Sequence, residues 1–426
     1  MGSEMCIRDR SKELKQVLIM KIFQSPLLIS SLVALFVAGC ETLPETQTVQ
    51  SAQIEKLQID EEPSELVNPL QVVATVKSKA VAVDLERQAL EWGYTLHKQE
   101  KLAGLNLYLL TFDCPPGVSP KDASLELERL QPKSSVGELN KYLLNSSQLS
   151  FSQPQVPKTF ANEMLGWPES GCDVPVKIGI IDGGLSEKFK QQTSAKIYTR
   201  SFIETAPSET AVRHGTSIGA ILADPARLKD VMLYSAAVVE QGENGNDYSS
   251  PTAILKALNW MILNDVKVVN ISLSGPPNKV LETALEVASE KGLLIVAAVG
   301  NQGQNSPPQF PAAYNTVLAA TAVDVEGDIY DKAVRGNHVD FSAPGVDIYI
   351  NVEGQSRYIS GTSIAAPFIT AAIASSLGMK EHKNRQDIIQ HFSGSATDLG
   401  PKGKDTIFGL GLINAKYICS AEQVKI

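Results

Sequence analysis

The sequence Gly361-Thr362-Ser363-Ile364-Ala365-Ala366-Pro367 constrains this chain more than any other stretch. The residues that follow, up to Ala374, are small and apolar, which predicts a helix buried on most sides. Proline fits best in the first turn of a helix, so Pro367 places the start of that helix near Ser363. A hydroxyl there faces the positive end of the helix dipole, beside N–H groups that can stabilise an oxyanion. Ser363 is therefore either a nucleophile or an ordinary helix cap.

Three other polar side chains stand at the ends of predicted elements: Asp182 after the apolar run 176–182, His214 before the small-residue helix 218–223, and Asn301 after the apolar run 293–299 and Gly300. Buried parallel strands read as continuous apolar runs, and their carboxyl ends meet at one edge of a sheet, where sites are built. Each residue also has an ordinary interpretation. Asp and Asn are common next to glycine in turns, and a lone histidine is usually structural.

Acyl transfer needs a nucleophile, a base, an acid that orients the base, and donors for the oxyanion. Ser363, His214, Asp182 and Asn301 supply these four parts, and the chain order Asp, His, Ser is that of subtilisin. Around these four positions, and over roughly residues 167–417, the sequence resembles the subtilisin-like serine proteases (subtilases). The resemblance implies an α/β fold with a parallel sheet flanked by helices, and a serine endopeptidase that acts on polypeptides.

The resemblance also implies the role of each site residue. Ser363 attacks the peptide bond, His214 transfers the proton, Asp182 orients His214, and Asn301 binds the oxyanion. Substrate backbone is expected to pair with the segment that contains Ser272, Leu273, Ser274, and to pass near Gly300. No cofactor is required, and structural calcium stays open because no ligand cluster matches the family's sites. The sequence departs from the family at Gly183, where the family usually has threonine or serine.

The length of the chain suggests several domains, and its charge argues against nucleic-acid binding. The chain has 426 residues, enough for two to three domains, and its hydrophobic content of 43% is that of an ordinary globular protein. Its formal net charge of −9 argues against nucleic acid as a partner, because phosphate binding needs a basic surface.

The N-terminal region reads as an export signal. Residues 22–39 are apolar and follow Lys21, and they end in Val-Ala-Gly before Cys40. This resembles a bacterial lipoprotein signal, in which Cys40 carries the lipid and anchors the protein to a membrane of the cell envelope; an ordinary signal peptide for secretion is the alternative. Residues 1–19 do not fit this signal and are left out of the fold prediction. Of the other cysteines, Cys172 and Cys419 flank the main domain and could pair in an oxidising envelope.

Between the signal and the main domain we expect a tether and a small module. Residues 40–69 are polar and predict a flexible tether. Within residues 70–150 the pattern predicts strands at 70–76, 94–99, 105–112 and 136–144 with helices at 80–92 and 120–130, which is the split βαβ arrangement. This ferredoxin-like α+β module resembles a subtilase propeptide whose tail, 142–155, blocks the cleft until a bond between 145 and 161 is cut. The alternatives are a generic α+β spacer, an interaction domain kept after maturation, and an inhibitor of another protease.

The catalytic domain is predicted over 160–420. Apolar runs predict strands at 176–181, 232–239, 266–272, 293–299 and 316–323, and helices are expected at 251–264, 278–291 and 364–377. Residues 330–343 are expected to form a hairpin, and His338, His382 and His391 are assigned to the surface. A self-maturing endopeptidase is the first hypothesis for function. The alternative is an inactive, surface-anchored binding protein on a subtilase scaffold.

Overall fold

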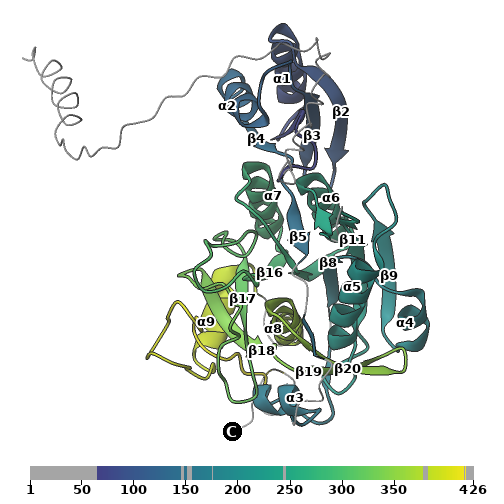
Figure 1. Cartoon of the computed structure of the whole chain (residues 1–426), viewed down its shortest axis with the longest axis vertical. Coiled ribbons are helices and arrows are strands. Elements are labelled where there is room, and N and C mark those ends of the chain that lie inside the picture. Colours follow the sequence, from purple (N-terminus) through teal and green to yellow (C-terminus); the bar gives the residue numbers. More distant parts are fainter. Residues whose placement is uncertain are drawn as a thin grey trace, which may run out of the picture. The chain divides into compact units, whose positions relative to one another are not determined.

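The computed structural model describes residues 65–144, 148–150, 156–174, 176–242, 246–377, 382–416 and 418, and the side chains of 148–150 are not described (Figure 1). All of these residues belong to one compact unit, Glu61–Ile426. The predicted signal, Cys40, most of the tether and Cys419 lie outside the described residues.

The first elements form a small α+β module: β1 (Gln71–Val76), α1 (Lys79–Glu91), β2 (Thr95–Leu102), β3 (Leu107–Asp113), α2 (Pro120–Leu130) and β4 (Ser134–Glu138). The four strands make one antiparallel sheet in the order β2-β3-β1-β4. Ser78 and Ser119 cap the two helices by accepting hydrogen bonds from backbone N–H groups. The split βαβ arrangement predicted from the sequence is therefore present.

The two faces of the module's sheet pack against different partners, because side chains alternate along a strand. One face, with Val72 and Ala74, forms a separate apolar core with α1 and α2. Val73, Leu107 and Leu109 on the other face belong to the large core of the rest of the chain.

The main sheet has seven parallel strands in the order β18-β17-β16-β14-β8-β11-β9. The strands are β8 (Lys177–Asp182), β9 (Lys196–Ser201), β11 (Met232–Ala237), β14 (Val266–Ile271), β16 (Leu294–Ala298), β17 (Leu318–Val323) and β18 (Val339–Pro344). The central strands are almost entirely apolar and buried, as expected for a sheet covered on both faces.

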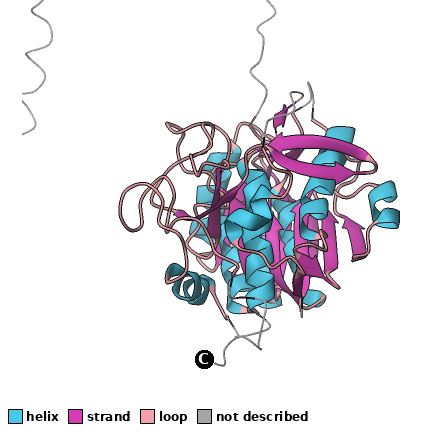
Figure 2. Cartoon of the chain, turned by 90° about the horizontal axis from the view of Figure 1, so that it is seen from below, coloured by secondary structure: helices cyan, strands magenta, loops and turns pink. Residues whose placement is uncertain are grey.

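Helices flank this sheet, as Figure 2 shows in cyan around the magenta strands. The helices are α3 (Phe160–Leu165), α4 (Glu187–Gln192), α5 (Glu209–Leu222), α6 (Pro251–Leu263), α7 (Lys279–Glu290), α8 (Thr362–Ser376) and α9 (Arg385–Ser393). Helix α8 packs on α5 and on five strands of the sheet, whereas α6 packs on α7. The predicted fold class, a subtilisin-like parallel sheet flanked by helices, is confirmed. No helix in the described part of the chain is both long and apolar enough to span a membrane.

The segment that leaves the module joins two smaller sheets. Strand β5 (Tyr142–Leu144) lies between β13 (Tyr248–Ser249) and β15 (Leu273–Ser274), and β12 (Val239–Glu240) completes that sheet. Strand β6 (Gln148–Ser150) pairs with the hairpin of β19 (Ile348–Val352) and β20 (Gln355–Ser360). A last pair joins β7 (Cys172–Asp173) to β10 (Leu228–Lys229). The single strand predicted over 136–144 was wrong, because β4 and β5 belong to different sheets.

The hairpin predicted at 330–343 was also wrong, since β18 runs parallel to β17 at the edge of the main sheet. Within β18, Asp340 is fully buried. Its carboxylate accepts hydrogen bonds from Ala319 N at 3.1 Å, Arg385 Nε at 3.0 Å and Lys404 Nζ at 3.1 Å. These three donors offset the cost of burying the charge.

The histidines assigned to the surface are less exposed than expected. His382 is only 4% exposed. His391 lies edge-on to Phe392, with ring centroids 4.8 Å apart, and burial lowers the pKa of His338. His382 and His391 also lie against each other, with ring centroids 4.7 Å apart.

Candidate active site

Asp182 stands at the carboxyl end of β8, in the middle of the main sheet, and is fully buried. Its Oδ1 accepts a hydrogen bond from Gly183 N at 2.7 Å, and its carbonyl accepts one from Val238 N at 2.9 Å. Both bonds fix the carboxylate at the strand end.

His214 lies within α5, and not before a helix start as predicted. The helix begins five residues earlier than His214, at Glu209, because the Ser208 hydroxyl caps it by accepting from Ala211 N at 3.0 Å. His214 Nδ1 is 2.9 Å from Asp182 Oδ1 and 3.1 Å from Oδ2. On the other side of the ring, Nε2 is 3.0 Å from Ser363 Oγ.

Glycines allow α5 to approach the end of β8 so closely. A Cβ on Gly183 would lie 2.2 Å from Ala211 O, and a Cβ on Gly215 would lie 2.1 Å from Gly184 O. The backbone of the helix and that of the strand end are therefore in direct contact on both sides of His214. This explains the departure at Gly183, since no side chain fits there.

Ser363 is the second residue of α8 and is fully buried. Pro367 lies inside the helix, beyond the first turn where it was expected. Because proline lacks an N–H, it cannot donate the usual helical hydrogen bond to the carbonyl of Ser363, four residues earlier. Ser363 thus occupies an irregular first turn that starts at Gly361, whose carbonyl accepts from Ile364 N at 3.0 Å.

Asn301 follows β16 and lies beside the start of α8. Its Oδ1 accepts hydrogen bonds from Thr362 N at 3.0 Å and from Thr362 Oγ1 at 2.8 Å. Gly300 N donates to the same threonine hydroxyl at 3.2 Å. With Oδ1 engaged as an acceptor, Nδ2 is the atom of Asn301 that can donate to an oxygen at the site. Thr362 was not predicted as a site residue, although it directly precedes Ser363 in the motif 361–367.

The predicted substrate-binding residues divide into two groups. Leu273 and Ser274 form β15, whose backbone pairs antiparallel with β5 at Leu144 and Leu143. Ser272 points into the core instead, where its hydroxyl accepts from Asn270 Nδ2 at 2.9 Å. Gly300 has a φ of 104°, and its carbonyl accepts from Val334 N at 3.1 Å. Of the predicted substrate-binding residues, Leu273 and Ser274 are therefore the two that pair with an extended chain in the described part of the structure.

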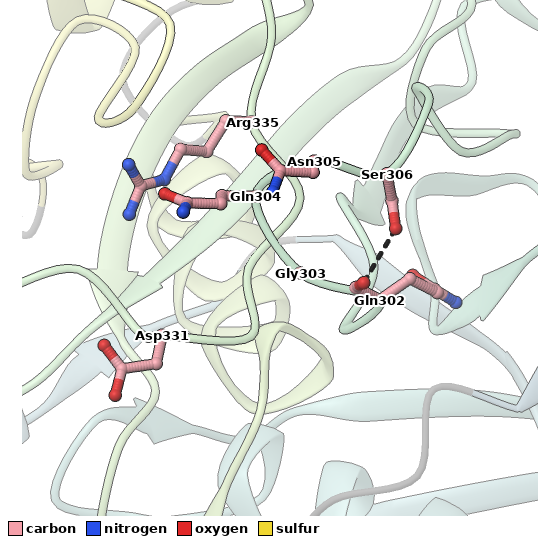
Figure 3. Close-up of a pocket in the computed structure, with 7 residues that line it drawn as sticks. All are labelled: Gln302, Gly303, Gln304, Asn305, Ser306, Asp331 and Arg335. Atoms are coloured by element: carbon pink, nitrogen blue, oxygen red, sulfur yellow. Dashed lines mark hydrogen bonds between the residues drawn. The ribbon is translucent and has the colours of Figure 1, made fainter.

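An open polar cavity of about 560 Å³ adjoins Asn301 (Figure 3). It is lined by Gln302, Gly303, Gln304, Asn305, Ser306, Asp331 and Arg335. Gln302 links it to the paired strand, since its Nε2 donates to Ser274 Oγ at 2.8 Å. None of these residues was predicted to belong to the site.

Among the described residues, no group of three or more His, Cys, Asp or Glu side chains could hold a metal ion. Cys172 is disulfide-bonded, and Cys114 is a free thiol. The predicted partner Cys419 is outside the described residues, and its pairing stays a prediction.

Comparison with known proteins identifies one family of similar sequences. A model of the Subtilase family matches residues 174–411. Minor extracellular protease Epr of Bacillus subtilis (strain 168) is 29% identical over 252 residues, which are 57% of this chain but only 38% of Epr. Subtilisin DY of Bacillus licheniformis is 29% identical over 255 residues, covering 57% of this chain and 89% of its own length.

Among solved structures, the crystal structure of fervidolysin from Fervidobacterium pennivorans, a keratinolytic enzyme related to subtilisin, is similar to this chain with a TM-score of 0.66. The likeness covers 83% of this chain and 61% of fervidolysin, at 17% sequence identity, and so concerns the fold alone. Since the family model spans more than half of the chain and includes Asp182, His214, Asn301 and Ser363, the chain belongs to the subtilase family.

Proposed function

We propose that this protein is a serine endopeptidase that hydrolyses peptide bonds in polypeptides. The observation that carries the proposal is the continuous set of contacts from Asp182 through His214 to Ser363, with heavy-atom distances of 2.9 Å and 3.0 Å. These are hydrogen-bond distances, and the order of the three groups is that of a catalytic triad.

Ser363 Oγ attacks the scissile carbonyl carbon while His214 Nε2 takes its proton. Asp182 accepts from His214 Nδ1–H and stabilises the imidazolium that forms. His214 then gives the proton to the leaving amine, and a water molecule hydrolyses the acyl-enzyme by the same steps in reverse order. Asn301 Nδ2 and the N–H of Ser363 hold the oxyanion. In subtilisin, loss of the corresponding amide costs about 10²–10³ in kcat.

The alternative of an inactive binding scaffold is not favoured. A scaffold that only binds has no need for a buried carboxylate, an imidazole and a hydroxyl in this order. Burying the charge of Asp182 costs free energy unless the carboxylate has hydrogen-bond partners.

We also propose that the protein matures itself by cutting between Leu144 and Gln148. Leu143 and Leu144 pair with β15, and Gln148 pairs with Ser360 at the end of β20, three residues before Ser363. An extended chain added to an open strand edge is how proteases hold backbone. The bond to be cut lies between these two pairings, within a range that is narrower than the sequence alone predicted.

The module fits the role of a propeptide that blocks the cleft. Asn278 Nδ2, at the start of α7, donates to Glu138 O at 2.8 Å and to Asn140 Oδ1 at 2.7 Å. Asn259 Oδ1, in α6, accepts from Gly104 N at 2.7 Å. Together with the apolar face described above, these bonds support tight docking of the module on α6 and α7.

For localisation we propose export from the cytoplasm, with a lipid on Cys40 as the anchor to the cell envelope. The order of Lys21, the apolar run and Cys40 supports both parts of this proposal, whereas the extracellular relative Epr supports export alone.

The proposed activity can be tested with diisopropyl fluorophosphate and denatured casein, on protein incubated until its mass is constant. Ser363 Oγ is expected to displace fluoride and form one phosphoryl adduct, located by peptide mass spectrometry, and untreated protein is expected to fragment casein. Protein unfolded in urea is the control and should gain no adduct. Intact casein together with an unmodified Ser363 would overturn the proposal.

Replacing Gly183 with serine tests the close contact between β8 and α5. The new Cβ would lie 2.2 Å from Ala211 O, a backbone atom that cannot move alone. We expect a loss of about 1–3 kcal/mol of stability, typical of overpacking, and a fall in kcat/KM of about 10²-fold as Asp182 and His214 move apart. Urea unfolding and peptide hydrolysis measure the two effects, with Gly394→Ser, whose added side chain meets open space, as the matched control. A variant as stable and active as the parent would refute this account of Gly183.

A further inference from the structure

Asp247 directly precedes β13 and contacts both the segment to be cut and the helix that carries His214. Its carbonyl accepts a hydrogen bond from Leu144 N at 3.3 Å. Its carboxylate accepts one from the hydroxyl of Ser208, the N-cap residue of α5. Asp247 is only 6% exposed, and burying a carboxylate costs free energy unless it accepts hydrogen bonds. We therefore expect the bond to Ser208 to persist.

Ser208 joins the start of α5 to this buried carboxylate. Its Oγ accepts a hydrogen bond from Ala211 N at 3.0 Å while its O–H donates to Asp247, so one hydroxyl makes both contacts. The carbonyl of Ser208 also accepts from Val212 N at 3.0 Å, as the first backbone bond of the helix. Loss of the hydroxyl would thus release the start of α5 from Asp247 but keep that backbone bond.

The first turn of α5 in turn affects where His214 lies. Ala211 O would be only 2.2 Å from a Cβ on Gly183, so the backbone of this turn rests against the strand end that carries Asp182. His214 follows in the second turn of the same helix, with Nε2 3.0 Å from Ser363 Oγ. Backbone hydrogen bonds join successive turns of a helix, so a shift of the first turn also moves His214.

The contact between Asp247 and Leu144 depends on an extended chain between β13 and β15. Strand β13 pairs with β5, so the strand that begins after Asp247 forms one edge of the place that β5 occupies. Any polypeptide in that place can donate to Asp247 O with the N–H that Leu144 supplies here. Substrate backbone and the helix of His214 therefore meet at one residue, whatever the side chains of the substrate.

We infer that Asp247 and Ser208 are positioning residues that couple the binding of substrate backbone to the placement of His214. Bound substrate holds the carbonyl of Asp247, the carboxylate of Asp247 holds the start of α5, and His214 stays at hydrogen-bond distance from Ser363. The inference rests on the proposed endopeptidase activity and adds two residues to it. Binding energy used in this way raises kcat, because it favours the arrangement in which the proton is transferred.

The test compares two peptides that copy residues 139–150 of this chain. In the second peptide an ester replaces the amide between Leu143 and Leu144, which removes the N–H that Asp247 O accepts and keeps every bond between Leu144 and Gln148. The enzyme is used after its mass has become constant, and mass spectrometry of the products also reveals any cleavage at the ester. We expect the ester peptide to have about tenfold lower kcat and a similar KM, since one hydrogen bond is worth about that factor.

Ser208→Gly removes the donor to Asp247, and glycine is itself an acceptable N-cap residue, so α5 is retained. We expect about tenfold lower kcat on the amide peptide. The ester should then raise KM without lowering kcat further, because the link to α5 is already broken. Asp247→Ala should behave in the same way. Asp247→Asn, whose amide oxygen can still accept from Ser208, should restore most of the parent's kcat.

Asn384→Gly is the matched control, because Asn384 is the N-cap residue of α9 and accepts from Asp387 N at 3.1 Å. It should have the parent's kcat and KM for both peptides. Urea unfolding shows whether each variant is folded, and Asp247→Ala takes the place of Ser208→Gly if the latter does not fold.

The outcomes separate this inference from the proposed activity. An ester effect on kcat as large in Ser208→Gly as in the parent would overturn the inference and leave Ser208 as an ordinary helix cap. Equal kcat values for the two peptides in the parent would also overturn it, as would a kcat of Asn384→Gly as low as that of Ser208→Gly. In all three cases the endopeptidase activity stands. If neither peptide nor casein were cleaved by the parent, the proposed function itself would fall.

Discussion

With alanine at position 363, the protein is expected to keep its module attached and to lose about 10⁶ in kcat, the magnitude reported for removing the serine of subtilisin. The reason is that Ser363 Oγ, 3.0 Å from His214 Nε2, is the atom that forms the acyl-enzyme. The intact mass of the purified variant, beside that of the parent, measures the first effect. Only the parent is expected to lose the part of the chain before the cut between Leu144 and Gln148.

Ser376→Ala is a matched control, because Ser376 is a buried serine of the same helix whose hydroxyl donates to Ile373 O at 2.8 Å. It should mature like the parent. If the Ser363 variant also lost its module when purified away from other proteases, cleavage would not be its own work. Loss of the module from neither protein would contradict self-maturation but not hydrolysis of other substrates.

Asparagine in place of Asp182 is expected to lower kcat by about 10⁴-fold while leaving the fold intact. The amide has nearly the same shape as the carboxylate and can still accept from Gly183 N, now 2.7 Å away. Its NH₂ group, however, can donate to His214 Nδ1, which favours the imidazole tautomer with the proton on Nε2. That tautomer cannot accept the proton of Ser363.

Hydrolysis of denatured casein, with urea unfolding as the check on folding, measures this effect. Asp173→Asn, at an exposed residue of β7, serves as the control for a lost charge. A decrease of less than tenfold in a folded Asp182→Asn protein would show that His214 does not depend on Asp182.

The sequence was sufficient to predict the residues that carry strong local signals. Apolar runs ending in Asp182 and Asn301 predicted strands of a parallel sheet, and Ser119 with Pro120 predicted the start of α2 correctly. The four site residues could be predicted because each lies in a short motif of neighbouring residues. The range matched by the family model includes all four. In the structure His214 lies within hydrogen-bond distance of both Asp182 and Ser363.

Features that depend on distant partners could not be predicted. The N-cap at Ser208 starts α5 well before the small-residue stretch that signalled a helix. The burial of Asp340 depends on Arg385 and Lys404, which lie 45 and 64 residues further along the chain. Strand β5 has only three residues, and its partners lie more than 100 residues away, so no local pattern could separate it from β4.

The segment that carries β5 and β6 is inserted into two sheets, and this insertion affects how the enzyme is kept inactive. While the chain is continuous, β5 and β6 are held to the catalytic part at an effective concentration that dilution cannot lower. Once a bond between Leu144 and Gln148 is cut, β6 stays with the catalytic part, and the module with β5 becomes a separate molecule. Its hold on the cleft then depends on its own concentration in solution. Release into a large volume would free the enzyme, whereas confinement at a membrane would keep it blocked.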